Sequence, residues 1–139
     1  IRAVRQPFEY ALPVPGRVQI GETGAVVQAS FEKGGPTLRT FGDGETTAVL
    51  QASALALPLP IRNRRVGDRF RPFGAPGRRK LQDVFVDRKV SRDARDQVPL
   101  VVDATGRIVW VAGLTIAEDC RVTSPESGVV ILKFKKGTQ

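Results

Sequence analysis

Residues 98–113, VPLVVDATGRIVWVAG, form the stretch of sequence that most directly decides the fold. Two apolar runs, VPLVVD and RIVWVAG, flank the short segment ATG, and a short glycine-containing loop between such runs is typical of a β-hairpin. Both faces of IVWVA are apolar, so we expect a central strand with Trp110 in the core. The stretch therefore predicts a β-rich domain built around this hairpin.

The β pattern continues on both sides of the hairpin. VVQASFE, residues 26–32, and VVILKFKK, residues 129–136, alternate apolar and polar side chains, which indicates half-buried strands. FEYALPVPG and RVQIGETG indicate two shorter strands joined at Pro15–Gly16, and GDG at residues 42–44 predicts a tight turn. Short strands separated by glycine and proline are typical of sandwiches and barrels.

Little helix is predicted, and both candidates lie in residues 79–97. Apolar side chains at helical spacing within RKLQDVFVDRKV predict a helix of about two turns. A second short helix is predicted over SRDARDQ, with Ser91 as its N-cap and Pro99 beyond its end. We therefore predict a mainly β sandwich with one or two short helices, with α+β as the alternative. Residues 1–139 form one domain, of which 1–58 are an N-terminal β part and 59–139 hold the helical insertion and the hairpin.

Composition excludes several classes of protein. With 139 residues, 41% of them apolar, the chain can bury one core. Methionine is absent even at position 1, so we expect a fragment of a longer chain. No apolar run approaches the roughly 18 residues that span a bilayer. Histidine is absent and Cys120 is the one cysteine, which argues against an autonomous hydrolase and a cysteine-based metal site.

Positive charge is concentrated in residues 61–96. They carry twelve basic and five acidic side chains, a net charge of +7 out of +8 for the whole chain. A localised basic block is the electrostatic footprint of a polyanion partner. The alternative is a solvated surface, for example with Arg92 and Arg95 on one helix face. Five carboxylates cannot neutralise twelve cations, and we therefore favour a polyanion-binding surface.

Two arginines of LPIRNRR face the same way if this run is a strand. Side chains two residues apart on a strand lie about 6.5–7 Å apart on one face, so Arg62 and Arg64 could reach neighbouring phosphates. Guanidinium groups bind phosphate oxygens through two hydrogen bonds. Gly67 and Asp68 then begin a loop, and Asp68 is interpreted as a turn residue or the partner of an arginine.

The loop VGDRFRPFGAPGRRK combines glycine, proline, arginine and phenylalanine. Glycine lets a backbone approach a ligand closely, and proline stiffens the loop. Arg69 and Arg71 alternate with Phe70 and Phe73, so bases could stack where arginines hold an RNA backbone. For these phenylalanines and Phe85 we favour the alternative of burial in the core. Neither GxxxxGK[ST] nor GxGxxG occurs here, so no ATP site is expected within the chain.

Four segments in one order resemble the C-terminal domain of tRNA(Ile)-lysidine synthetase: LPIRNRRVGDRFRPFG, RRKLQDVFVDRKV, RDARDQVPLVVD and GRIVWVAGL. LPVPGRV near the start and RVTSPESGVVILKF near the end also fit, so the resemblance covers most of the chain. Ser91 departs from the pattern, because proline is expected after DRKV. This departure affects the predicted start of the second helix.

The resemblance implies a parent enzyme that uses ATP with magnesium to adenylate the wobble cytidine of a CAU-anticodon isoleucine tRNA and then joins lysine to it. The family carries out this chemistry in an N-terminal domain with an SGGxDS-type loop, which is absent here. This chain is therefore expected to be non-catalytic and without a cofactor. Its implied role is tRNA binding, particularly at the acceptor-stem end, in the cytoplasm. The implied fold resembles a three-layer β-sandwich domain of the phenylalanyl-tRNA synthetase β subunit.

The resemblance carries basic residues over as candidates for RNA contact: Arg62, Arg64, Arg69, Arg78, Arg79, Lys80, Arg88, Lys89 and Arg95. Gly67 and Asp68 are expected to shape the loop, and no catalytic or metal-binding residue is expected. The missing catalytic domain is a second expected partner, a homodimer stays open, and no membrane contact is expected. The alternative function is an interaction module whose basic face docks on an acidic partner. A self-sufficient enzyme is a third hypothesis, against which the missing histidine and nucleotide loop argue.

Overall fold

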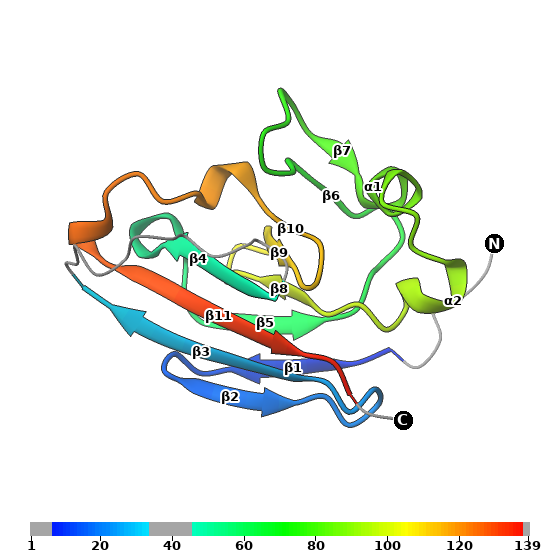
Figure 1. The fold of residues 1–139 in the computed structure, drawn as a ribbon, viewed down its shortest axis with the longest axis horizontal. Coiled ribbons are helices and arrows are strands. Elements are labelled where there is room, and N and C mark those ends of the chain that lie inside the picture. The colour runs from blue at the N-terminus through cyan, green and yellow to red at the C-terminus, as the bar shows by residue number, and fades with distance from the viewer. Residues whose placement is uncertain (1–6, 34–45, 138–139) are drawn as a thin grey trace.

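Two antiparallel sheets make up most of the domain (Figure 1). The structure, a computed structural model, describes residues 7–33 and 46–137. The turn predicted at residues 42–44 lies outside the described residues. The five-stranded sheet has the order β1 (Glu9–Leu12), β5 (Leu59–Arg62), β8 (Leu100–Val102), β9 (Ile108–Val111), β10 (Thr115–Ile116). The four-stranded sheet has the order β2 (Gly16–Gln19), β3 (Val26–Glu32), β11 (Val129–Lys135), β4 (Thr47–Gln51).

Shorter elements complete the described chain. A two-stranded ribbon pairs β6 (Arg69–Phe70) with β7 (Arg79–Lys80), and the helices are α1 (Leu81–Asp87) and α2 (Arg92–Arg95). Three 3-10 turns are η1 (Ala52–Ala54), η2 (Glu118–Cys120) and η3 (Pro125–Ser127). The predicted fold class, mainly β with two short helices, is confirmed. The described residues contain no helix long and apolar enough to cross a bilayer.

The predicted hairpin lies at the centre of the core. Strands β8 and β9 pair antiparallel, with a register shift between Val101 and Val102. Trp110 is fully buried, and its ring meets the edge of Phe134 on β11 with 6.4 Å between ring centroids. Because Trp110 and Phe134 belong to different sheets, this contact joins the two layers. The core therefore lies between the sheets, as the apolar faces of IVWVA predicted.

Strands β1 and β2 were predicted as neighbours in sequence, and the structure places them in different sheets. Strand β1 pairs with β5, whereas β2 pairs with β3. The chain crosses from one layer to the other at residues 13–15, where two of the three residues are proline. Proline lacks the N–H that a continuing ladder needs, so the strand ends there.

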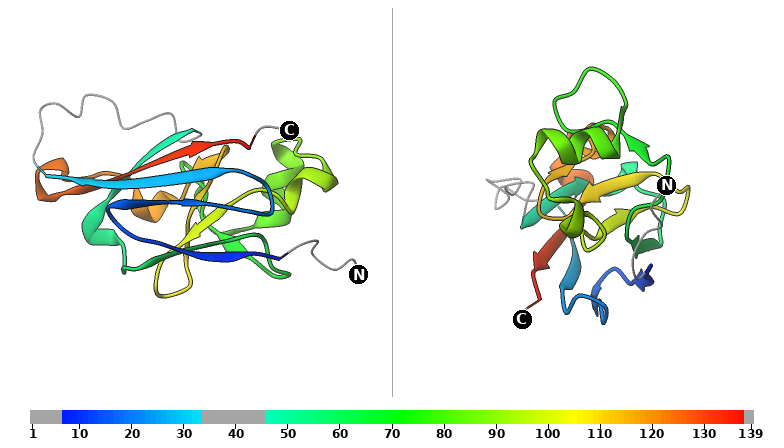
Figure 2. Two further views of the ribbon diagram at one scale, coloured as in Figure 1. Left: turned by 90° about the horizontal axis from the view of Figure 1, so that it is seen from below. Right: turned by 90° about the vertical axis from the view of Figure 1, so that its right-hand side faces the viewer.

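The basic segment is one excursion from the five-stranded sheet. Strands β5 and β8 are hydrogen-bonded neighbours, so residues 63–99 leave the sheet and return beside the strand they left. This excursion contains the β6–β7 ribbon and both helices. Figure 1 and the right-hand view of Figure 2 show the ribbon loop standing away from the sheets. The sheet connectivity therefore gathers the charge of residues 61–96 at one end of the domain.

Candidate nucleic-acid interface

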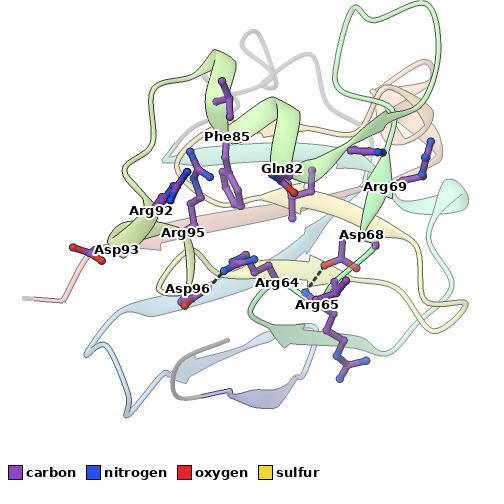
Figure 3. A pocket seen from close by; sticks show the side chains of 15 residues that line it. Arg64, Arg65, Asp68, Arg69, Gln82, Phe85, Arg92, Asp93, Arg95 and Asp96 are labelled. Atoms are coloured by element: carbon purple, nitrogen blue, oxygen red, sulfur yellow. Dashed lines mark hydrogen bonds and ion pairs between the residues drawn. The ribbon is translucent and has the colours of Figure 1, made fainter. Parts of the chain in front are cut away.

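A groove of about 570 Å³ lies between the loop after β5, helix α1 and helix α2 (Figure 3). We call it the basic groove. Its charged lining consists of six cations and three carboxylates: Arg64, Arg65, Arg69, Lys80, Arg92 and Arg95 against Asp68, Asp93 and Asp96. All of these residues come from the excursion between β5 and β8. The groove is therefore built from the same segment that carries the charge of the chain.

One wall of the groove is held by an ion pair between Arg62 and Asp68. The two guanidinium nitrogens of Arg62 donate to the two carboxylate oxygens of Asp68 at 2.9 and 3.0 Å. Their side chains are only 9% and 12% exposed. Asp68 also accepts the backbone N–H of Arg65 at 2.7 Å, and Gly67 has the positive φ of 89° that this tight turn requires. This ion pair closes the loop, and the charges of Arg62 and Asp68 neutralise each other.

A second ion pair ties this loop to helix α2. The Nε of Arg64 lies 2.5 Å from an Asp96 carboxylate oxygen, and the Asp96 side chain is 9% exposed. Next to it, the Asn63 side chain donates to the Asp96 carbonyl at 3.0 Å and accepts the Phe8 N–H at 3.2 Å. The buried Asn63 thus bridges the N-terminal strand region and the end of α2.

The expectation that Arg62 and Arg64 project from one strand face is wrong. Strand β5 ends at Arg62, and Arg64 lies beyond it. The reason is that buried Asn63 takes its hydrogen bonds from outside the sheet, as described above, so the strand alternation stops there. Both arginines pair with aspartates within the domain. The structure therefore places them as supports of the groove wall.

Arg69 and Lys80 face each other across the ribbon at the edge of the groove. They are paired residues of β6 and β7, so their side chains share a face, with Cβ atoms about 4.5–5.5 Å apart. Both are exposed, and among the described residues neither has a carboxylate within ion-pair distance. Like charges placed directly opposite each other destabilise a strand pair. This arrangement is unfavourable until an anion binds between them.

Lys80 carries a second unfavourable feature. It is the N-cap of α1, and its side chain makes no capping hydrogen bond. Asparagine, serine and aspartate are preferred at this position because they accept backbone N–H groups, and a cation there opposes the helix dipole. Two independent local preferences are thus violated at one residue. Functional use is a frequent reason for such violations.

The twelve basic residues of the segment 61–96 can be grouped by what their side chains contact. Five of the twelve cations in residues 61–96 pair with a carboxylate in the described part of the chain: Arg62–Asp68, Arg64–Asp96, Arg65–Glu9, Arg71–Asp119 and Arg79–Asp87. Two others donate to backbone carbonyls, Arg88 to Leu114 at 3.3 Å and Arg95 to Val90 at 3.0 Å. Arg95 also lies 6.0 Å from the centroid of the Phe85 ring.

The other five cations of residues 61–96 are exposed and make no ion pair or side-chain hydrogen bond with the described residues: Arg69, Arg78, Lys80, Lys89 and Arg92. We call them the open cations. Four of them belong to the candidate set derived from the sequence. Arg92 does not belong to this set and is named only, together with Arg95, in the alternative of a solvated helix face. Its proximity to Arg69 and Lys80 around one groove arises from tertiary folding, which no local pattern reports.

The phenylalanines of the segment separate into two kinds. Phe70 and Phe85 are buried in the core, as expected. The expectation of burial is wrong for Phe73, which is 58% exposed. It lies in the loop between β6 and β7, where the chain has left the sheets. An aromatic ring is thus exposed in the loop at the end of the ribbon, although it is not among the residues that line the basic groove.

No catalytic group accompanies the groove in the part of the chain that the structure describes. Cys120 is fully buried, and this burial raises the pKa of its thiol to about 11. The thiol is therefore protonated at neutral pH and is not a nucleophile. Residues 7–33 and 46–137 contain no cluster of three or more histidine, cysteine or acidic side chains that could hold a metal ion. The groove lining carries six cations against three carboxylates, a charge balance that suits an anionic ligand.

The fold and groove together define a class: a small β-sandwich domain with a cationic binding surface. A family model described as "TilS substrate C-terminal domain" matches residues 59–132. This match spans more than half of the 139 residues. The chain belongs to this family.

Curated relatives and a solved structure agree with the family. The chain is 30% identical to a tRNA(Ile)-lysidine synthase of Bacillus subtilis over 133 residues, 94% of this chain and 27% of that protein. It is 43% identical over 94 residues to a bifunctional protein TilS/HprT of Listeria monocytogenes, covering 68% of this chain and 14% of that protein. A crystal structure of a TilS C-terminal domain superposes with a TM-score of 0.81 at 29% identity, over 96% of this chain and all of that one. The chain thus spans about a quarter or less of these curated relatives.

Proposed function

We propose that the basic groove and the adjoining ribbon bind the phosphate backbone of tRNA. The observation that carries the proposal is the like-charged pair of Arg69 and Lys80, which lie opposite each other on the ribbon. Neither forms an ion pair with a carboxylate of the described residues. A phosphate between them would remove their mutual repulsion and accept hydrogen bonds from both. Arg92 lines the same groove, and Arg78 and Lys89 belong to the same excursion from the five-stranded sheet.

The structure supports parts of the candidate set unequally. We assign phosphate contacts first to Arg69, Arg78, Lys80 and Lys89, and we add Arg92. Arg79, Arg88 and Arg95 follow, because each already has an internal partner that RNA would have to replace. Arg62 and Arg64 are proposed to position the wall, because their donors already serve aspartates.

The names of the relatives support a wider proposal for the parent protein. We propose that the full-length protein joins lysine to the wobble cytidine of a CAU-anticodon isoleucine tRNA, using ATP and magnesium in another domain. Within it, this domain would bind the acceptor-stem end, and the parent would act in the cytoplasm. A homodimer stays a prediction. The competing hypothesis, docking of the basic face on an acidic protein, is an outcome of the experiment below.

The test is a titration of this chain with isoleucine tRNA at several salt concentrations. With about four phosphate contacts, log affinity should fall against log salt with a slope of roughly −3 to −4. We expect the double variant Arg69→Gln/Lys80→Gln to reduce this slope by about two and to weaken binding about tenfold or more at low salt. Intact tRNA should bind better than tRNA truncated at its acceptor end.

A matched control removes the same charge elsewhere. Lys133 and Lys135 are exposed on β11 in the four-stranded sheet and do not line the groove. The variant Lys133→Gln/Lys135→Gln should therefore bind tRNA nearly as well as the unmodified chain. Equal losses in both double variants would show a nonspecific charge effect. Salt-independent binding, or none at low salt, would contradict the proposal and favour a protein partner.

A further inference from the structure

The exposed Phe73 ring is held outward by a rigid turn. The Phe73 N–H donates to the carbonyl of Ile116 at 3.0 Å, and the Gly74 N–H donates to a Glu118 carboxylate oxygen at 2.8 Å. Within the turn, the Ala75 N–H donates to the Pro72 carbonyl at 2.9 Å. These bonds tie the turn to the region of β10 and η2 on the body of the domain. The ring is therefore presented by a fixed backbone.

The loop that carries the ring is open and has no acidic residue of its own, and the carboxylate of Glu118 that contacts it is bonded to the Gly74 N–H. Residues 69–80 contain five cations and no acidic side chain. At Gly74 and Gly77, an added Cβ would meet no other heavy atom within 4 Å, so the backbone beside the ring is accessible. Arg78, one of the open cations, completes this tip. The tip therefore offers an aromatic face, uncovered backbone and positive charge.

This combination distinguishes between two kinds of partner. An apolar protein surface would be matched by further apolar side chains near the ring, whereas the loop that carries Phe73 has Arg71 before it and Arg78 and Arg79 after it. Aromatic rings among cations are typical of sites for unpaired nucleotides, where the ring stacks on a base and the cations hold the phosphates. A fully paired duplex hides its base faces inside the stack, so it offers the ring no base within the helix.

We propose that Phe73 stacks on an unpaired nucleobase of the RNA that the basic groove binds. Arg78 contacts a phosphate next to that base, while Arg69 and Lys80 hold the backbone at the base of the ribbon. This inference rests on the proposed function and adds a ligand class: RNA with a single-stranded extension beside a duplex. It also assigns a role to the Phe73 side chain, which is exposed and does not pack in the hydrophobic core.

The experiment compares two RNA hairpins that share one duplex. One ends flush, and the other carries a short single-stranded 3′ extension. Loss of one base–aromatic stack should weaken binding of the extended hairpin to Phe73→Ala about 5- to 100-fold. Binding of the flush hairpin should change less than about twofold, and the salt slope should stay the same for both, because no charge is removed.

Two further variants separate stacking from general apolar contact. Phe73→Trp keeps an aromatic face and should retain the preference for the extended hairpin, whereas Phe73→Leu should lose most of it. The matched control is Phe31→Ala, because Phe31 is a similarly exposed phenylalanine, at 50%, on strand β3 of the four-stranded sheet. It should leave the affinities for both hairpins unchanged, and circular dichroism checks that each variant is folded.

The failures of the two proposals are distinguishable. If Phe73→Ala binds both hairpins like the unmodified chain while Arg69→Gln/Lys80→Gln weakens both, the stacking inference is overturned and the phosphate-binding function stands. Equal losses of Phe73→Ala on both hairpins would also overturn it, because the ring would then contact the duplex. If the unmodified chain binds neither hairpin at low salt, both proposals fail.

Discussion

The loop of residues 62–68 and the ribbon of residues 69–80 follow each other in the chain but use their cations in opposite ways. In the loop, Arg62, Arg64 and Arg65 each pair with a carboxylate, and Asp68 lies within the loop itself. The ribbon has five cations and no acidic residue of its own. Two of its arginines reach acids elsewhere, and the other three cations are open.

The difference shows how pairing with carboxylates, with burial at Arg62, divides one basic segment into supporting residues and cations that are open to a ligand. A buried arginine must be paired, because an uncompensated charge away from water is costly. An exposed arginine can stay unpaired at little cost, since water solvates it. Repulsion between neighbouring open cations then favours a polyanion ligand. Net charge therefore identifies the segment, and only burial and pairing show which residues can bind.

The largest effect is expected from breaking the loop. Arg62→Ala leaves the carboxylate of Asp68 nearly buried without its partner, and should lower the free energy of unfolding by about 3 kcal/mol. Urea denaturation measures this change. The comparison residue is Arg92, whose replacement by alanine should alter stability by less than about 0.5 kcal/mol and weaken tRNA binding. If Arg62→Ala were as stable as the unmodified chain, the division into support and surface would be wrong.

An effect of intermediate size should appear at Lys80, with opposite signs for stability and binding. Lys80→Asn introduces a preferred N-cap and removes a cation from the start of α1, so the free energy of unfolding should rise by about 0.5–1 kcal/mol. The same change should weaken tRNA binding several-fold and reduce the salt slope by about one. Denaturation and RNA titration of one preparation give both values. Parallel changes in the two quantities would contradict a binding role for Lys80.

The smallest effect concerns the anchor of the ribbon turn. The Gly74 N–H, with help from Arg121 and Arg71, holds the pKa of Glu118 below its ordinary value of 4.5. The stability contributed by the ionised form is therefore present above pH 4.5 and is lost as pH falls through the lower, folded pKa. The amide resonance of Gly74 should titrate with that lowered pKa. Glu118→Gln should abolish this titration, while the Ala75 amide, bonded to a backbone carbonyl, should not follow it.

Much of the strand framework is predictable because alternation of side chains is a local property. VVQASFE became β3 and the apolar runs around ATG became β8 and β9. The Ser91 cap of α2 was equally local, since its hydroxyl accepts the Ala94 N–H three residues away. Which strands share a sheet is not a local property, and the sequence pattern did not indicate that β1 and β2 belong to different sheets.

For the site, the sequence by itself determined that a basic segment with glycine-rich loops exists. Net charge and composition are sums over the residues of a segment, so they do not depend on how the chain folds. Tertiary structure decided which cations are available, because pairing depends on side chains that meet only after folding. It buried Arg62 against Asp68, joined Arg64 to Asp96 across 32 positions, and brought Arg92 to the same groove as Arg69 and Lys80. It also left Phe73 in solvent, because that residue lies in the loop between β6 and β7, outside the two large sheets.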